Sequence, residues 1–309
     1  MASKVYFTRA LDGDAVVKMF KKVGVELKGK IALKIHSGEV NGPYFLKPAY
    51  LKPIYDLTKG TFVECNAAYK DFFARGSRYT TELHQKILKD NGWEGTQFVI
   101  MDENPEKDKK IKVEGGEIIK ENILGEHYDE FDSLLVVAHF KGHPVGGFGG
   151  ALKQLSIGFA SRAGKTQIHT AGKTLDYNIC FDNCCTAKEF CKGMGEAASS
   201  VHKYYKAKNM GGPVYICVLK DISLYCDCTG LAAPAPEIND IGILSSTDPV
   251  AIDQACLDLI KKTKDKGTEK FLEQVKNLSG EEALTTAEKL GAGSTKYELV
   301  FDEGDGPKV

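Results

Sequence analysis

Short apolar runs alternate with amphipathic stretches along the first half of the chain. Residues 61–67 (TFVECNA) and 133–140 (SLLVVAHF) are rich in β-branched and aromatic residues, which is typical of buried strands. Residues 14–25 and 80–92 instead place apolar residues three or four positions apart, as amphipathic helices do. This alternation indicates βαβ units, so we expect an α/β fold with a mainly parallel sheet and helices on both of its faces.

The same patterns predict the remaining elements and the domain organisation. Further strands are expected at 4–10, 30–37, 97–103, 212–222 and 240–246, further helices at 47–60, 151–161, 186–208 and 248–262, and an edge strand at 296–301. A cysteine-rich piece interrupts the alternation. Because there is neither an internal repeat nor a low-complexity linker, we expect one composite α/β domain over 1–309, with an insertion at 171–211.

Charge and hydropathy exclude two classes of partner. The chain has 41 basic and 42 acidic residues, whereas nucleic-acid binding depends on a clear excess of Lys and Arg. The longest apolar runs fall far short of the roughly 20 residues that a membrane span requires. We therefore expect neither a nucleic-acid nor a membrane partner. Residues 1–17 lack a hydrophobic core followed by a cleavage site, which predicts a cytoplasmic protein.

Several polar residues come directly after predicted strands. Ligands of parallel sheets collect at the carboxyl ends of the strands, so these side chains are expected to share one crevice. For any one of them, a plain role in forming a turn is the alternative. The residues are Lys34, His36, Glu39, Asn66 and His139.

The most unusual stretch is 139–169, which holds three of the seven histidines among glycines, lysines and an arginine. Glycines at a strand-to-helix turn let the backbone approach a ligand, and the N–H groups of a helix N-terminus favour an anion. A small anionic molecule is therefore the expected partner. A plain tight turn is the alternative, because the stretch has neither a dinucleotide fingerprint nor a P-loop pattern. The candidate contact residues are Lys34, Gly146, Gly147, Gly149, Gly150 and Lys153.

Lys153 is the least expected residue of this stretch. It falls on the first turn of the predicted helix, where a cation faces the positive end of the helix dipole. An anionic or covalent partner is needed to neutralise it there.

The nine cysteines fall into two groups. Cys65, Cys217 and Cys256 stand singly in apolar surroundings and are expected to be buried. The others form two clusters, Cys180, Cys184, Cys185 and Cys191 in the first, and Cys226 and Cys228 in the second. One metal ion or a single iron–sulfur cluster shared between the two clusters is one interpretation. For the first cluster we favour the alternative that its thiols are left over from a lost metal site and hold no ligand. Whether the second cluster binds a metal is left open.

Most of the chain resembles the uncharacterised iron–sulfur-centre proteins, also called domain of unknown function 362. The matching stretches are LKIHSGE (33–39), GHPVGGFGGALKQLSIGFASRAGK (142–165), CDC (226–228) and DIGILSSTDPVAIDQA (240–255). Members of that family typically carry a ferredoxin-like insert with repeated C-x-x-C spacing. This chain has CFDNCCTAKEFC (180–191) in that place.

A narrower stretch resembles the cofactor-binding region of the lactate racemases, which holds a nickel-pincer nucleotide. The order of a histidine, a G-F-G-G turn, a lysine and a second histidine matches, with ten positions from His143 to Lys153 and sixteen from Lys153 to His169. The resemblance implies that His143 is a catalytic base, Lys153 the covalent attachment point and His169 the metal ligand. Histidine suits both roles, because its pKa lies near neutrality and its neutral ring binds borderline metals.

The chain departs from the racemase pattern at the second catalytic base. The nearest segment, ARGSRYTTEL (74–83), has no suitable histidine, so racemisation is not expected; His36 is the candidate for a replacement base. The leading hypothesis is a metal- or cofactor-dependent enzyme that acts on a small anionic substrate by hydride and proton transfer, an oxidoreductase or isomerase. The alternatives are an iron–sulfur electron-transfer protein, with Cys226 and Cys228 as candidate ligands, and a non-catalytic anion-binding protein.

Overall fold

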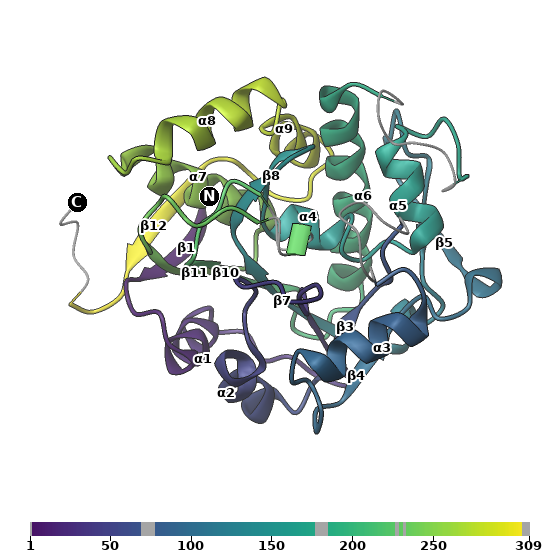
Figure 1. The fold of residues 1–309 in the computed structure, drawn as a ribbon, viewed down its shortest axis with the longest axis horizontal. Coiled ribbons are helices and arrows are strands. Elements are labelled where there is room, and N and C mark those ends of the chain that lie inside the picture. Colours follow the sequence, from purple (N-terminus) through teal and green to yellow (C-terminus); the bar gives the residue numbers. More distant parts are fainter. Residues whose placement is uncertain (1, 69–77, 177–184, 226–228, 231–232, 305–309) are drawn as a thin grey trace.

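An eight-stranded sheet forms the centre of the protein, in the order β12-β1-β11-β10-β7-β2-β3-β4 (Figure 1). The structure is a computed structural model that describes residues 2–68, 78–176, 185–225, 229–230 and 233–304. The strands of the sheet are β1 (Ser3–Thr8), β2 (Ile31–Lys34), β3 (Thr61–Glu64), β4 (Phe98–Ile100), β7 (Ser133–His139), β10 (Val214–Leu219), β11 (Gly242–Ser246) and β12 (Tyr297–Phe301).

The strand pairing confirms the predicted α/β fold with a mainly parallel sheet. β10, β7, β2, β3 and β4 run parallel to their neighbours in that order, and β12 pairs parallel with β1. β11 is antiparallel to both β1 and β10, so the sheet is mixed at this point. β12 lies at the edge of the sheet, as its sequence predicted.

Alternate residues of the central strands face two separate hydrophobic cores. In β7, Leu134, Val136 and Ala138 belong to one core, whereas Leu135 and Val137 belong to the other. All seven residues of β7 are buried, because helices cover both faces of the sheet.

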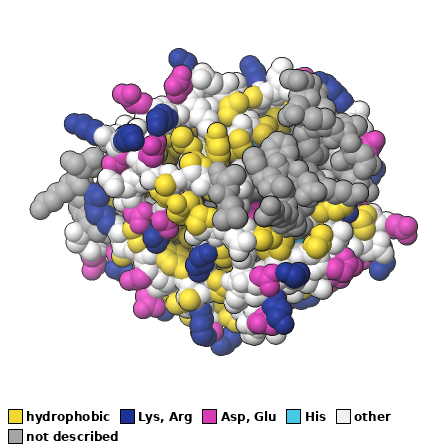
Figure 2. Space-filling model, in the orientation of Figure 1, with side chains coloured by type: hydrophobic (Ala, Val, Ile, Leu, Met, Phe, Trp, Pro, Cys, Tyr) yellow, Lys and Arg dark blue, Asp and Glu magenta, His cyan; other side chains and the backbone are white. Residues whose placement is uncertain are grey.

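The helices divide between these two faces. α1 (Gly13–Lys22), α2 (Pro48–Thr58) and α3 (Thr81–Asp90) contribute to one core, and α4 (Ala151–Leu155), α5 (Arg162–His169), α6 (Ala187–Ala207), α7 (Pro249–Lys262), α8 (Thr268–Asn277) and α9 (Glu282–Lys289) to the other. On the face shown in Figure 2, apolar side chains gather towards the centre and charged ones towards the rim. None of the helices in the described parts of the chain is both long and apolar enough to cross a membrane.

The structure differs from the sequence prediction in the region that carries the candidate site. The single helix expected at 151–161 is wrong: α4 ends at Leu155, and α5 begins after Ser161, whose side chain accepts a hydrogen bond from Gly164 N. The glycine-rich turn before α4 forms a short hairpin of β8 (Lys141–His143) and β9 (Gly147–Gly149). A second hairpin, β5 (Lys109–Lys112) with β6 (Glu121–Leu124), was not predicted either.

Candidate functional site

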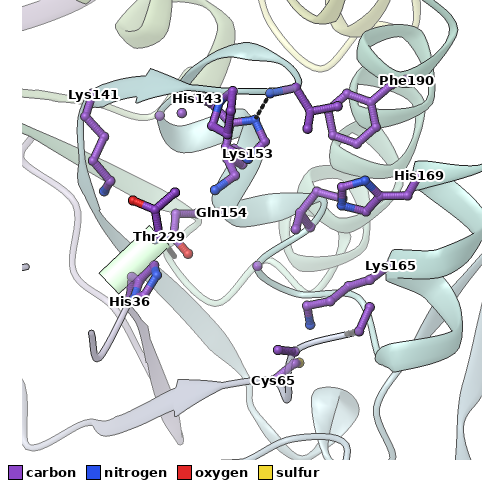
Figure 3. Close-up of a pocket in the computed structure, with 18 of the residues that line it drawn as sticks. His36, Cys65, Lys141, His143, Lys153, Gln154, Lys165, His169, Phe190 and Thr229 are labelled. Atoms are coloured by element: carbon purple, nitrogen blue, oxygen red, sulfur yellow. Dashed lines mark hydrogen bonds between the residues drawn. The ribbon is translucent and has the colours of Figure 1, made fainter. Parts of the chain in front are cut away.

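A cavity of about 450 Å³ lies at the carboxyl ends of β2, β3 and β7, where the strand-end rule predicted a crevice. His36 follows β2, Glu64 and Cys65 follow one another at the end of β3, and His139 ends β7; all four line the cavity. Side chains from the β8–β9 hairpin, α4 and α5 point into the same space (Figure 3). Of the five residues predicted to share a crevice, His36 and His139 line this cavity. Lys34 lies behind the wall, Glu39 bonds Arg78, and Asn66 bonds Asp102.

The described lining of this cavity is rich in basic side chains. Its cations are Arg78, Lys141, Lys153 and Lys165, its histidines are His36, His139, His143 and His169, and its carboxylate is Glu64. Because most of these cations are buried, the cavity attracts anions more strongly than an exposed cluster of the same charges does.

Asp253 of α7 holds the helix that carries Lys153. Its two carboxylate oxygens accept hydrogen bonds from Ala151 N at 2.7 Å and Leu152 N at 2.9 Å. These are N–H groups of the first turn of α4, so the prediction that this helix N-terminus receives a ligand anion is wrong. Burial raises the pKa of Asp253 to about 7, although the two backbone hydrogen bonds oppose the shift. Asp253 thus caps the first turn of the helix that carries Lys153.

Gly150 allows Asp253 to approach α4, and its replacement by alanine should destabilise the protein. A Cβ at this position would lie 2.3 Å from Asp253 Oδ1, so we expect a loss of about 1 to 3 kcal/mol in the free energy of unfolding. Gly193→Ala in α6 is the matched control: its nearest neighbour, Ile119 Cγ1, would be 3.7 Å away. That change should stabilise the helix by roughly 0.5 to 1 kcal/mol. Urea unfolding of both variants checks this, and equal effects of the two would contradict it.

The β8–β9 hairpin fixes the orientation of the His143 ring. Its Nδ1 accepts hydrogen bonds from Gly146 N at 2.9 Å and Val145 N at 3.3 Å. Burial, and then the nearby side chains of Lys153, His169 and Lys141, hold the pKa of His143 well below its ordinary value. The ring is therefore neutral near pH 7, and its proton resides on Nε2.

His169 ends α5 and reaches the same cavity from the other side of Phe190. The Phe190 ring lies 4.7 Å from the His169 ring and 6.2 Å from the His143 ring, centroid to centroid. Burial lowers the pKa of His169 to about 3, with further contributions from Lys153 and Lys165. The imidazole is thus neutral, which is the form that binds a metal ion.

Lys34 is fully buried beneath the cavity and acts on it through Gln154. Its Nζ donates to Gln154 Oε1 at 2.8 Å and to the carbonyl oxygen of Ile35. Burial lowers the pKa of Lys34 to about 8, although the nearby carboxylate of Glu64 opposes the shift. The sequence predicted Lys34 as a direct ligand contact, whereas the structure places Gln154 between Lys34 and the cavity.

A buried ionic network supports the wall formed by β2 and β3. Arg78 bonds both Glu39 and Glu64, and Glu64 also accepts from the backbone N–H and the hydroxyl of Ser37. His84 Nε2 lies 3.4 Å from Glu64 Oε2. These contacts fix Glu64, which lines the cavity, and pair its charge with that of Arg78.

The sequence of the chain also matches a known family over most of its length. The family described as a domain of unknown function, DUF362, matches residues 31–258. The chain belongs to the DUF362 family. A comparison with curated proteins finds no match.

Two solved structures are similar to this DUF362 chain at low identity. A crystal structure of a protein from Thermotoga maritima has 15% identity and a TM-score of 0.41, and the match covers 90% of this chain and 58% of that one. The lactate racemase apoprotein from Thermoanaerobacterium thermosaccharolyticum has 16% identity and a TM-score of 0.40, over 70% of this chain and 50% of that one. This chain therefore spans 58% of the first protein and half of the second.

The DUF362 chain brings together some of its predicted site residues and not others. His36, His143, Gly149, Gly150, Lys153 and His169 line the cavity. Gly146 instead donates to His143, and Gly147, with φ +79°, packs against Val275 of α8. Cys180, Cys184, Cys226 and Cys228 lie outside the described residues. Within the described parts of the chain, no group of three or more His, Cys, Asp or Glu residues is placed to hold a metal ion.

Sequence reasoning missed Lys141, Gln154, Lys165 and Asp253 as parts of this site. Lys165 had a usable signal, because it ends the GK pair that closes the matching stretch 142–165. Gln154 and Asp253 also lie in matching stretches, at 142–165 and 240–255, but their roles depend on contacts with residues more than one hundred positions away.

Proposed function

We propose that the cavity is the active site of a cofactor-dependent enzyme that acts on a small anionic substrate. The observation that supports this best is that His143, Lys153 and His169 line one buried cavity although they come from β8, α4 and α5. Both histidines are neutral, and the remaining cations of the lining suit anionic groups of a ligand. Perturbed histidines and a lysine that converge in a cavity are typical of an active site.

The residues of this cavity fit a metal-bearing pyridinium nucleotide held on Lys153. The Lys153 amine would be the point of covalent attachment, and the neutral His169 ring would be the metal ligand. Such a group, when bound, would supply an acceptor for hydride. The volume of about 450 Å³ lies within the usual range for a cofactor site.

The chain's own residues would bind and orient the anionic groups. Lys165 is 7% exposed, and its Nζ donates to the carbonyl oxygen of Ala160, which fixes the ammonium beside the cavity. Lys141 is held in the same way by the carbonyl oxygen of His139. Two ammonium groups fixed in a buried site hold phosphate or carboxylate oxygens at little entropic cost. We propose His36 as the candidate proton-transfer group, since it lines the same cavity.

Attachment to Lys153 can be tested by intact-mass and metal analysis of protein from nickel-supplemented cells. We expect a mass adduct and bound nickel in the wild type, and neither in Lys153→Ala. Lys52→Ala in α2 is the control, because it removes an exposed lysine outside the cavity and should keep the adduct. A wild type without metal and without an adduct would exclude this cofactor.

A non-catalytic anion-binding protein is the second candidate. It is favoured by the excess of cations over carboxylates in the described lining. Phosphate binding by a protein that carries no adduct and no metal would support it over the enzyme.

A further inference from the structure

Two neutral side chains of the cavity wall have their acceptor atoms occupied by hydrogen bonds within the protein. Each can therefore only donate a hydrogen bond to a ligand in the cavity. His143 Nδ1 is occupied by the N–H groups of Val145 and Gly146. A neutral imidazole with an acceptor at Nδ1 carries its proton on Nε2. Because Nδ1 is engaged and Nε2 is already protonated, the ring offers no acceptor to a substrate proton.

The side-chain amide of Gln154 is oriented in a similar way by a residue that does not line the cavity. Its Oε1 accepts from Lys34 Nζ at 2.8 Å, and Lys34 has no acceptor lone pair in its charged form. The amide oxygen of Gln154 therefore points towards Lys34 and away from the cavity. The NH₂ group of Gln154 is thereby left for the cavity that Gln154 lines.

We propose that His143 and Gln154 form a carboxylate-binding donor pair beside Lys153, and that His143 serves as a hydrogen-bond donor to the substrate rather than as its base. This proposal deepens the proposed function and rests on it for the statement that the bound molecule is a substrate. The chemical class follows from the wall itself, since an acceptor-only group such as a carboxylate satisfies every donor. A hydroxyl or an amide in the same place would leave one of its own protons without a partner.

The charges around the pair agree with this class. Lys153 lines the cavity beside Gly149 and Gly150, and among the charged side chains it acts most strongly on His143. A neutral donor that is already oriented needs no reorganisation when negative charge arrives or develops on a substrate oxygen. A neutral imidazole used in this way polarises a carbonyl oxygen without giving up its proton.

The ring assignment can be tested directly on protein without a cofactor. Nitrogen NMR of selectively labelled histidine, assigned with His143→Gln, should show His143 protonated on Nε2 and not titrating between pH 5.5 and 8. A ring protonated on Nδ1, or a titration near pH 6.5, would overturn the proposal. This result is independent of whether Lys153 carries an adduct, so it separates the donor role from the cofactor proposal.

Oxalate is the probe for the carboxylate class, with binding measured by calorimetry on the same protein. His143→Phe and Gln154→Leu should each weaken oxalate binding roughly 10- to 100-fold, the value of a hydrogen bond to a charged group. His143→Gln keeps an N–H donor at the outer end of the side chain and should recover most of the affinity. Wild-type affinity in His143→Phe, or no oxalate binding by the wild type, would overturn the proposal.

Discussion

Replacement of Arg78 by methionine should lower the free energy of unfolding by about 3 to 5 kcal/mol at pH 7, the usual cost of breaking a buried ion pair from one side. Arg78 is 6% exposed and bonds two carboxylates, those of Glu39 and Glu64, which are 7% and 4% exposed. Methionine fills a similar volume but leaves both charges buried without their cation. Urea unfolding at pH 7 measures the loss.

The pH dependence of the same variant has a definite sign. Burial favours the neutral form of Glu64, but the charge of Arg78, the hydrogen bond with His84 and the charges of His36 and Lys34 outweigh it and hold the pKa well below 4.5. A carboxyl with a lowered pKa stabilises the fold above its unfolded-state pKa, and this contribution is lost as the pH falls. The deficit of Arg78→Met should therefore be complete from pH 7 down to about 5 and shrink as the pH falls below 4.5.

A second substitution separates the charge effect from packing. Adding Glu64→Gln to Arg78→Met removes one of the two unpaired carboxylates, so part of the stability should return. A loss below 1 kcal/mol in the single variant, or no recovery in the double variant, would show that the network does not hold this wall.

Asp253→Ala should destabilise the protein by about 2 to 4 kcal/mol, because two buried N–H groups lose their acceptors. Ala151 N and Leu152 N would then begin a five-residue helix without a cap. We also expect less of any adduct at Lys153, since the same helix positions that side chain. Asp253→Asn should be intermediate, because its amide can accept from one N–H but presents its NH₂ group to the other.

The effect of Asp253 on stability should have the opposite pH dependence to that of Glu64. Burial raises the pKa of Asp253 to about 7 from an unfolded value of 3.8. A raised pKa means that the stabilising contribution is complete near pH 4 and is lost as the pH rises through 7. The difference between the wild type and Asp253→Ala in urea unfolding should therefore be larger at pH 4 than at pH 8. A constant difference would show that Asp253 does not change its proton binding on folding.

The sequence predicted those strands whose burial is visible in their composition. Every residue of β7 is buried, so SLLVVAH is apolar almost throughout, whereas three of the four residues of KKIK in β5 are exposed and give no signal. The sequence also does not indicate that β11 runs antiparallel to its two neighbours. Its five residues are all buried, and they would be buried in either orientation.

The candidate site was predictable where its residues follow one another along the chain. His143, Lys153 and His169 lie within one stretch, so their spacing could be compared with a known motif. The roles of His143 and Lys34 were not predictable, because they depend on which atom of Gly146 or Gln154 each side chain meets. The expected anion at the N-terminus of α4 failed for the same reason, since Asp253 comes from α7.

The strand order also determines at what stage of chain synthesis each part of the site can form. β2, β3, β4 and β7 can pair once residue 139 has left the ribosome, but β1 lies between β11 and β12 and waits for partners made much later. Asp253 belongs to this late segment. Lys153 thus emerges about a hundred residues before its helix is capped, and the attachment proposed for this lysine would follow completion of the chain.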